Sequence, residues 1–157
     1  LEAEGFKPAK TMPVGIMVEV PSAALTAETL AREADFFSIG TNDLFQYTLG
    51  IEREDASDSS YGLFLPPSIV QLVQTVAEAA GARKKPAAVC GELAHNPLVV
   101  PLLIGLGITE LSMDASHIPA TRRIVRGVSY AACRELAAKA LKLETPEEMR
   151  ELLKRGP

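Results

Sequence analysis

A chain of 157 residues has room for one domain, or for one part of a larger domain. Hydrophobic residues make up 47% of it and charged residues 23%, a balance that is typical of a globular protein and excludes a disordered one. The net charge of −4 disfavours nucleic acid and anionic membrane surfaces, because both attract an excess of basic residues. We therefore expect no nucleic-acid partner and no membrane partner.

Nothing in the sequence signals export. No apolar run approaches the roughly 20 residues that span a bilayer, and no secretory leader opens the chain. The two cysteines, Cys90 and Cys133, are too few for a disulfide framework or a tetrahedral zinc site. We therefore expect a cytoplasmic protein. Because residue 1 is leucine and the first four residues resemble the end of a helix, we also expect the chain to be a part of something longer.

The first part of the chain alternates strands and helices. Residues 14–20 form a nearly continuous apolar run, which is typical of a parallel strand buried on both faces. Pro21 opens a helix with an alanine-rich apolar stripe over 23–34. A second strand is predicted at 36–40, and a polar loop follows at 52–60.

The alternation continues and then gives way to helices alone. The next predicted elements are a helix at about 67–80, a strand at 86–90, a helix from 96 to the glycines at 105–107, a strand at 110–113 and a helix at 118–126. An alanine-rich helix is predicted at 129–143. A last helix begins where Thr145 provides the cap, Pro146 the first helical position and Glu148 the reciprocal capping carboxylate.

Strands that alternate with helices form a parallel sheet, because parallel neighbours need a crossover connection. A doubly wound sheet and a barrel both satisfy this pattern. A complete eight-unit barrel takes about 250 residues, so four units take about 125, which is close to the length of the segment 13–128. The chain therefore accommodates four βα units, half of a (β/α)8 TIM barrel, but not a whole one.

Reactive side chains follow all four predicted strands, at the edge where parallel α/β sheets bind ligands. The first strand ends at Glu19, the second at residues 41–43, the third at Cys90 and the fourth at Asp114. Each acidic or amide side chain alone is more often the cap of the next helix. Their recurrence at four strand ends indicates a shared site.

Glu19 and Asp43 form a carboxylate pair on neighbouring strand ends. One or two carboxylates commonly hold Mg²⁺, together with substrate phosphate and water, and the absence of histidine from these positions disfavours zinc and iron. Asn42 can present its amide to a phosphate or carboxylate oxygen. Arg53 offers the planar fork that suits phosphate, although composition alone favours reading it as one member of a solvated charge cluster at 52–55.

The two cysteines receive different interpretations. Cys90 lies at a strand end, where a thiol can donate or accept a proton. Cys133 lies inside the alanine-rich helix and is expected to be an inert core residue.

Three blocks of sequence resemble the phosphoenolpyruvate (PEP)-utilising enzymes. GIMVEVPSAAL, DFFSIGTNDL and VCGELA are similar to signature blocks of that family's substrate barrel, and they occur in the right order. The stretch from Pro97 to Leu153 resembles one branch, the PEP–protein phosphotransferases of the bacterial sugar phosphotransferase system. With this resemblance, we expect residues 1–128 to be the C-terminal half of the PEP-binding barrel and residues 129–157 its C-terminal helical extension.

The resemblance also implies roles for individual residues. Glu19 and Asp43 would hold Mg²⁺, and Asn42 and Arg53, together with Asp43, would bind PEP. Cys90 would protonate the enolpyruvate that remains after phosphoryl loss, giving pyruvate.

The same branch implies a longer enzyme and further partners. Its phosphoryl group passes to a histidine of a separate N-terminal domain and then to a small phosphocarrier protein, and it forms homodimers. Residues 116–120 mimic the phosphorylatable-histidine motif only superficially, so we expect His117 to have a structural role. Without the acceptor domain, the isolated chain is expected to be inactive.

Three alternatives remain open. A related PEP synthase or pyruvate phosphate dikinase has a similar barrel, and Mg²⁺-dependent lyases that handle pyruvate enolate also use a glutamate and an aspartate at strand ends. A non-catalytic dimerisation module is the third.

Overall fold

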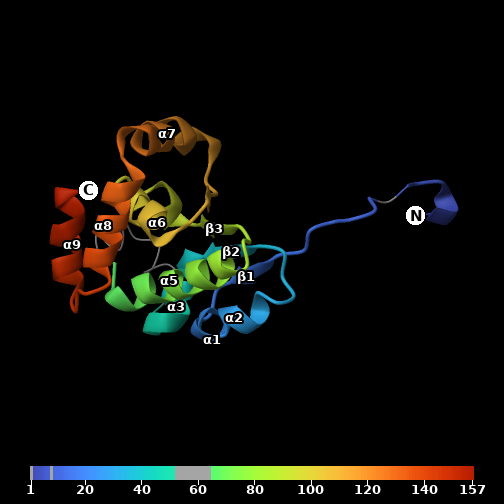
Figure 1. Cartoon of the computed structure of the whole chain (residues 1–157), viewed down its shortest axis with the longest axis horizontal. Helices are drawn as coiled ribbons and strands as arrows, with labels where there is room; N and C mark the ends of the chain where they lie inside the picture. The colour runs from blue at the N-terminus through green and yellow to red at the C-terminus, as the bar shows by residue number, and fades with distance from the viewer. Residues whose placement is uncertain (1, 8, 52–64) are drawn as a thin grey trace.

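The protein, described by a computed structural model over residues 2–7, 9–51 and 65–157, is built around one four-stranded sheet (Figure 1). All neighbouring strands are parallel, and their order in the sheet follows their order along the chain. The strands are β1 (Ile16–Val18), β2 (Phe37–Gly40), β3 (Ala87–Cys90) and β4 (Glu110–Leu111). The predicted α/β fold with a parallel sheet is therefore confirmed, although the first and last strands are shorter than expected.

The two faces of the sheet differ in burial. Val18, Phe37 and Ile39 are fully buried, whereas Met17 is 50% exposed and Ser38 is half-buried. Because side chains alternate between the two faces of a strand, one face is covered and the other is open in the described part of the chain. The expectation that the first strand is buried on both faces is wrong for this reason.

Eight α-helices lie in the described part of the chain. They are α1 (Pro21–Leu25), α2 (Ala27–Leu30), α3 (Thr41–Leu49), α5 (Pro67–Ala82), α6 (Val100–Leu106), α7 (Ile118–Gly127), α8 (Tyr130–Ala140) and α9 (Pro146–Arg155). The described residues also form three short 3-10 helices, η1 (Glu2–Glu4), η3 (Glu92–His95) and η4 (Ala115–His117). None of the described helices combines the length and the apolar character that crossing a membrane requires.

Helix α5 forms the centre of the covered face. Ile69, Val73 and Val76 are buried on one side of this helix, because residues three or four apart share a helix face. This helix contacts β2 and β3 as well as α1, α2 and α6. Burying each such side chain contributes about 1.5–3 kcal/mol, so this layer holds the strands, and the loops that follow them, in place.

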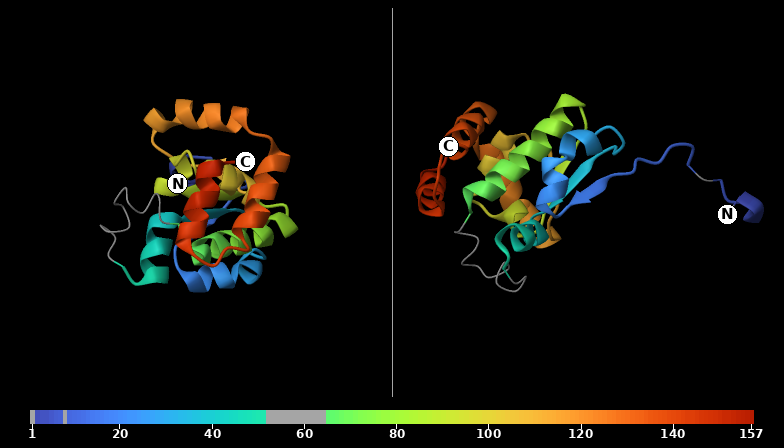
Figure 2. Two further views of the ribbon diagram at one scale, coloured as in Figure 1. Left: turned by 90° about the vertical axis from the view of Figure 1, so that its left-hand side faces the viewer. Right: turned by 90° about the horizontal axis from the view of Figure 1, so that it is seen from below.

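Helix α8 packs against α6, and α9 packs in turn against α8. Figures 1 and 2 show α8 and α9 side by side at the end of the molecule that carries the C-terminus. Gly105 lets α6 and α8 approach closely, since a Cβ at this position would lie 2.0 Å from the carbonyl oxygen of Cys133. The Nη1 atom of Arg134 donates a hydrogen bond of 3.1 Å to the Gly105 carbonyl.

Three parts of the helix prediction differ from the structure. The single helix predicted from Pro21, with its stripe over 23–34, is two short helices, α1 and α2, which are separated at Thr26. Helix α3 was not predicted, because it begins directly after Gly40 and its first residues were assigned to the end of the strand. Helix α6 begins at Val100 rather than at Asn96. The side chain of Asn96 accepts a hydrogen bond of 3.0 Å from the backbone N–H of Leu98, and this local turn precedes the helix.

Candidate active site at the carboxyl edge of the sheet

The strand register brings the predicted site residues to one edge of the sheet. Val18 pairs with Ile39 and Gly40 pairs with Cys90. Glu19 and Asn42 therefore leave their strands at the same edge as the Cys90 thiol. This is the carboxyl edge, where parallel α/β sheets bind their ligands.

The Glu19 side chain lies directly over the last residue of β2. A Cβ built on Gly40 would lie 2.7 Å from Cγ of Glu19 and 2.9 Å from its Oε1. A Cβ at position 40 would therefore force the Glu19 carboxylate to move. The first strand end is thereby brought against the second, one residue before the Thr41–Asp43 segment.

The second and third strand ends are joined by hydrogen bonds. The Thr41 hydroxyl donates to the carbonyl of Cys90 at 2.8 Å, and the backbone N–H of Glu92 donates to Oδ1 of Asn42 at 3.2 Å. Gly91 lies between these contacts with a φ of 92°, and a Cβ there would lie 2.7 Å from Oδ1 of Asn42. The glycine therefore provides both the backbone conformation and the space that the junction needs.

Asp43 follows Asn42 in the first turn of α3. A carboxylate in this position benefits from the positive end of the helix dipole. The structure therefore places Glu19 and Asp43 at the same edge, on the first and second strand ends. Arg53, predicted to bind the phosphate, lies outside the described residues. Asp114 immediately precedes η4, after β4.

The Cys90 thiol lies on the open face of the sheet. Its Sγ atom donates to the carbonyl of Ile39 at 3.5 Å and accepts from the Ser38 hydroxyl at 3.7 Å. It also lies 3.8 Å from Sδ of Met17. The thiol thus contacts the adjacent strand β2 and, beyond it, Met17 of β1, and it is only half-buried.

Cys133 has a different environment. It is fully buried in α8, the helix that packs against α6, and burial raises the pKa of its thiol because a thiolate loses hydration in an apolar surrounding. This supports a core role for Cys133.

The carboxylates at this edge fit Mg²⁺ better than a metal that needs three or more protein ligands. Within residues 2–7, 9–51 and 65–157, no group of three or more histidine, cysteine, aspartate and glutamate side chains is arranged to hold a metal ion. Magnesium needs fewer protein ligands, since one or two carboxylates suffice when phosphate and water complete the octahedron. Glu19 and Asp43 are two carboxylates at this edge, and the missing Cβ of Gly40 makes the room that the Glu19 side chain occupies.

A pair of stacked histidines near this edge was not predicted. The rings of His95 and His117 lie 3.9 Å apart at an angle of 16°, and Nε2 of His95 is 3.5 Å from Oε2 of Glu92. His95 ends η3 and His117 ends η4, so the pair joins the segments that follow β3 and β4. The two histidines lie on segments that follow different strands, and no regular spacing along the sequence relates them. The sequence therefore contains no indication of their contact.

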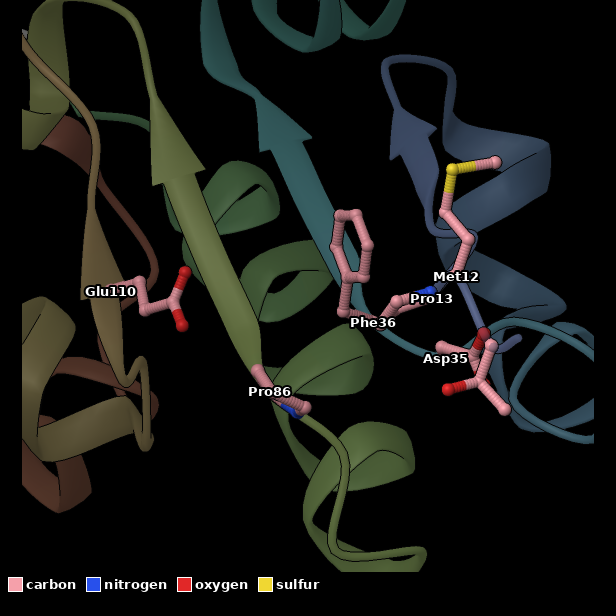
Figure 3. A pocket seen from close by; sticks show the side chains of 7 residues that line it. Met12, Pro13, Asp35, Phe36, Pro86 and Glu110 are labelled. Atoms are coloured by element: carbon pink, nitrogen blue, oxygen red, sulfur yellow. The ribbon is translucent and has the colours of Figure 1, made fainter. Parts of the chain in front are cut away.

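The open face also carries a hollow at the opposite edge of the sheet (Figure 3). Its volume is about 850 Å³, and it is lined by residues around the starts of the strands: Thr11, Met12, Pro13, Asp35, Phe36, Pro86 and Glu110. None of the predicted site residues that the structure describes lines it. The hollow is therefore separate from the edge that carries Glu19, Asn42 and Cys90.

Comparison with known proteins identifies relatives over nearly the whole chain. The chain is 43% identical over 155 residues to the phosphoenolpyruvate-protein phosphotransferase of Staphylococcus carnosus, an alignment that covers 98% of this chain and 27% of that protein. It is 44% identical over 144 residues to the multiphosphoryl transfer protein of Xanthomonas campestris, covering 92% of this chain and 17% of that protein. The chain thus spans about a quarter or less of the length of these curated relatives.

The resemblance noted in the sequence is confirmed by the family comparison. The model of the PEP-binding domain of PEP-utilising enzymes matches residues 1–130, which include all three signature blocks and every predicted site residue. The chain therefore belongs to the PEP-binding domain family of the PEP-utilising enzymes.

Proposed function

We propose that residues 1–128 are the C-terminal half of a (β/α)8 barrel that binds PEP, and that residues 129–157 are its helical extension. The strand order supports a barrel, because a doubly wound sheet reverses its order at a switch point and this sheet does not. The open face also supports it, since that face becomes the packed interior when a barrel closes. In this proposal, the remaining four βα units belong to a longer enzyme.

The observation that carries the functional proposal is the meeting of acidic, amide and thiol groups at one sheet edge. Glu19 and Asp43 are the residues that would hold Mg²⁺. When it is bound, Mg²⁺ neutralises charge on the phosphoryl oxygens, which is the main requirement of phosphoryl transfer. Gly40 supports this assignment, because its missing Cβ leaves the Glu19 carboxylate at the sheet edge.

Asn42 is proposed to contact PEP through its amide nitrogen. Its Oδ1 accepts the N–H of Glu92, which fixes the amide plane and leaves the NH₂ group to donate to a phosphate or carboxylate oxygen. Arg53 is proposed as a second phosphate ligand, and the positive fork of a guanidinium suits that role.

Cys90 is proposed to be the general acid that completes the reaction. Transfer breaks the bond between phosphorus and the enol oxygen, and the phosphoryl group passes to a histidine nitrogen of an N-terminal domain of the same enzyme. The C=C electron pair of the remaining enolate then takes the Cys90 proton at the methylene carbon. The S–H pair stays on sulfur as a thiolate, and the product is the ketone pyruvate.

The same proposal assigns partners. A small phosphocarrier protein would receive the phosphoryl group from the histidine, and the relative named multiphosphoryl transfer protein supports a relay of this kind. We also propose a homodimer and a cytoplasmic location, where PEP and the carrier are available.

The test is the substitution Cys90→Ala in the full-length enzyme, with Cys133→Ala as its control. We expect Cys90→Ala to reduce pyruvate formation from PEP by at least about 100-fold, the lower range for loss of a general acid. Cys133→Ala removes a buried thiol away from the site and should retain activity. Unchanged pyruvate formation in Cys90→Ala would overturn the proposal, and carbon–carbon bond cleavage that survives Cys90→Ala would indicate a lyase instead.

The isolated 157-residue chain gives a second test of the same proposal. Mixed with PEP, Mg²⁺ and the carrier, it should produce no pyruvate, because the proposal places the acceptor histidine in another domain of the full-length enzyme. Calorimetry should detect millimolar binding of PEP or none, since the proposal assigns the other half of the PEP-binding barrel to the longer enzyme. Steady turnover by the isolated chain would contradict the proposal.

A further inference from the structure

The Cys90 sulfur has a neighbour for which the proposed reaction provides no role. Ser38 lies on β2, on the same open face of the sheet as the thiol, and its hydroxyl donates to Sγ of Cys90 at 3.7 Å. The backbone places the two side chains there, because β2 and β3 pair Ser38 with Ala88 and Gly40 with Cys90. Ser38 therefore lies beside Ala88, two residues before Cys90 on β3, and its side chain points to the same face of the sheet as the thiol.

The Cys90 sulfur is a hydrogen-bond donor to some of its neighbours and an acceptor from another. Sγ is placed to donate its proton to the carbonyl of Ile39, at 3.5 Å, while the Ser38 hydroxyl approaches the sulfur as a donor. Sδ of Met17, at 3.8 Å from Sγ, is a second and weaker acceptor for the same proton. Among the described residues, Ser38 is thus the side chain that donates a hydroxyl proton toward this sulfur.

A donor to the sulfur matters most after the proton has left. In the protonated thiol the hydrogen bond from Ser38 is weak, because a neutral sulfur is a poor acceptor. When Cys90 gives its proton to the enolate carbon, the S–H electron pair remains on sulfur, and a hydrogen bond to this charged acceptor is considerably stronger. A contact that strengthens as charge develops lowers the barrier of the step.

We propose that Ser38 is a positioning residue for Cys90: it holds the thiol in the rotamer that faces the open side of the sheet and stabilises the thiolate left after proton transfer. The catalytic part of this inference rests on the proposed function, whereas the effect of Ser38 on the thiol does not. The two can therefore be tested separately.

The thiol is tested by its rate of alkylation with iodoacetamide near neutral pH, in the full-length protein and without PEP or metal. Two variants of equal shape, Ser38→Thr and Ser38→Val, differ only in the hydroxyl. We expect Ser38→Val to slow alkylation of Cys90 by about threefold or more, and Ser38→Thr to retain the rate. Ser22→Ala, on the exposed side of α1, is the matched control for loss of a serine hydroxyl elsewhere.

Steady-state kinetics of pyruvate formation then test the catalytic part. Ser38→Val should lower kcat by a similar factor and leave KM for PEP unchanged, because Ser38 acts on the thiol and not on the substrate. Equal alkylation rates for Ser38→Thr and Ser38→Val, with both variants folded by circular dichroism, would overturn the inference. A slowed alkylation with an unchanged kcat would overturn its catalytic part, and loss of activity in Cys90→Ala keeps that outcome distinct from failure of the proposed function.

Discussion

At the scale of single residues, the candidate site depends on two glycines that make room for polar side chains. Gly40 leaves room for the Glu19 carboxylate, and Gly91 leaves room for the Asn42 amide. Two neighbouring strand ends therefore make contact because a glycine from one strand end meets a polar side chain from the other. Substitution of such a glycine tests the site without removing any proposed ligand.

We predict that Gly40→Ala weakens Mg²⁺ binding by about tenfold or more, because the new Cβ would stand within 2.9 Å of Oε1 of Glu19 and push the carboxylate away. The measurement is calorimetric titration of Mg²⁺ into the full-length protein in the presence of PEP. Gly81→Ala is the matched control, since a Cβ there meets no atom within 4 Å. Equal affinities in the two variants would show that this glycine does not position a metal ligand.

A second glycine controls helix packing rather than the site. In Gly105→Ala the Cβ would lie 2.0 Å from the carbonyl oxygen of Cys133, so α6 and α8 must separate. We expect the free energy of unfolding to fall by about 3 kcal/mol, measured by urea denaturation. Gly81→Ala should instead raise it by up to about 1 kcal/mol, because alanine favours a helix. A Gly105→Ala protein as stable as the Gly81→Ala protein would exclude the close contact.

At the scale of elements, helix α9 depends on a reciprocal capping box. The backbone N–H groups of Glu144 and Thr145 donate to Oε2 of Glu148 at 3.1 and 3.2 Å, and Thr145 accepts from the N–H of Glu148. These hydrogen bonds, first from Glu144 and then from Thr145, lower the pKa of the Glu148 carboxyl. They favour the ionised form, which is the form that caps the helix.

The lowered pKa predicts how the stability of α9 depends on pH. Because the carboxyl is more acidic in the folded state, its contribution is complete above its ordinary pKa of 4.5 and is lost as the pH falls through the lowered value. The protection factors of the α9 amides, which are corrected for the pH dependence of intrinsic exchange, should therefore fall in acid, and Glu148→Gln should remove this part of the pH dependence. Glu151→Gln, on the same helix, is the control. An identical acid response in Glu148→Gln and the unmodified protein would contradict the prediction.

The sequence patterns predicted some elements better than others. The capping box at Thr145 and the four parallel strands were predictable, because each depends on local residue types and spacing. Helix α3 was missed since no loop separates it from β2. The stacking of His95 on His117 and the approach of Ser38 to Cys90 were not predictable, because contacts between distant segments depend on the strand register.

At the scale of the whole molecule, the unpaired outer edges of the sheet have a consequence for association. Both outer edges of the sheet, at β1 and β4, lack a further strand among the described residues, and unpaired edges promote association between chains. We predict that the isolated 157-residue chain self-associates, as measured by light scattering. A monodisperse monomer would argue against the half-barrel, because it would show that these edges need no partner.

The central claim is that the first two strand ends hold one divalent ion beside PEP. Its most direct test is calorimetric titration of PEP into the full-length protein with Mg²⁺, comparing Glu19→Gln and Asp43→Asn with Glu28→Gln, an exposed glutamate of α2. We predict that Glu19→Gln and Asp43→Asn each lose at least about tenfold in Mg²⁺-dependent affinity for PEP, whereas Glu28→Gln retains it. Unchanged Mg²⁺-dependent binding in either of the first two variants would contradict the account.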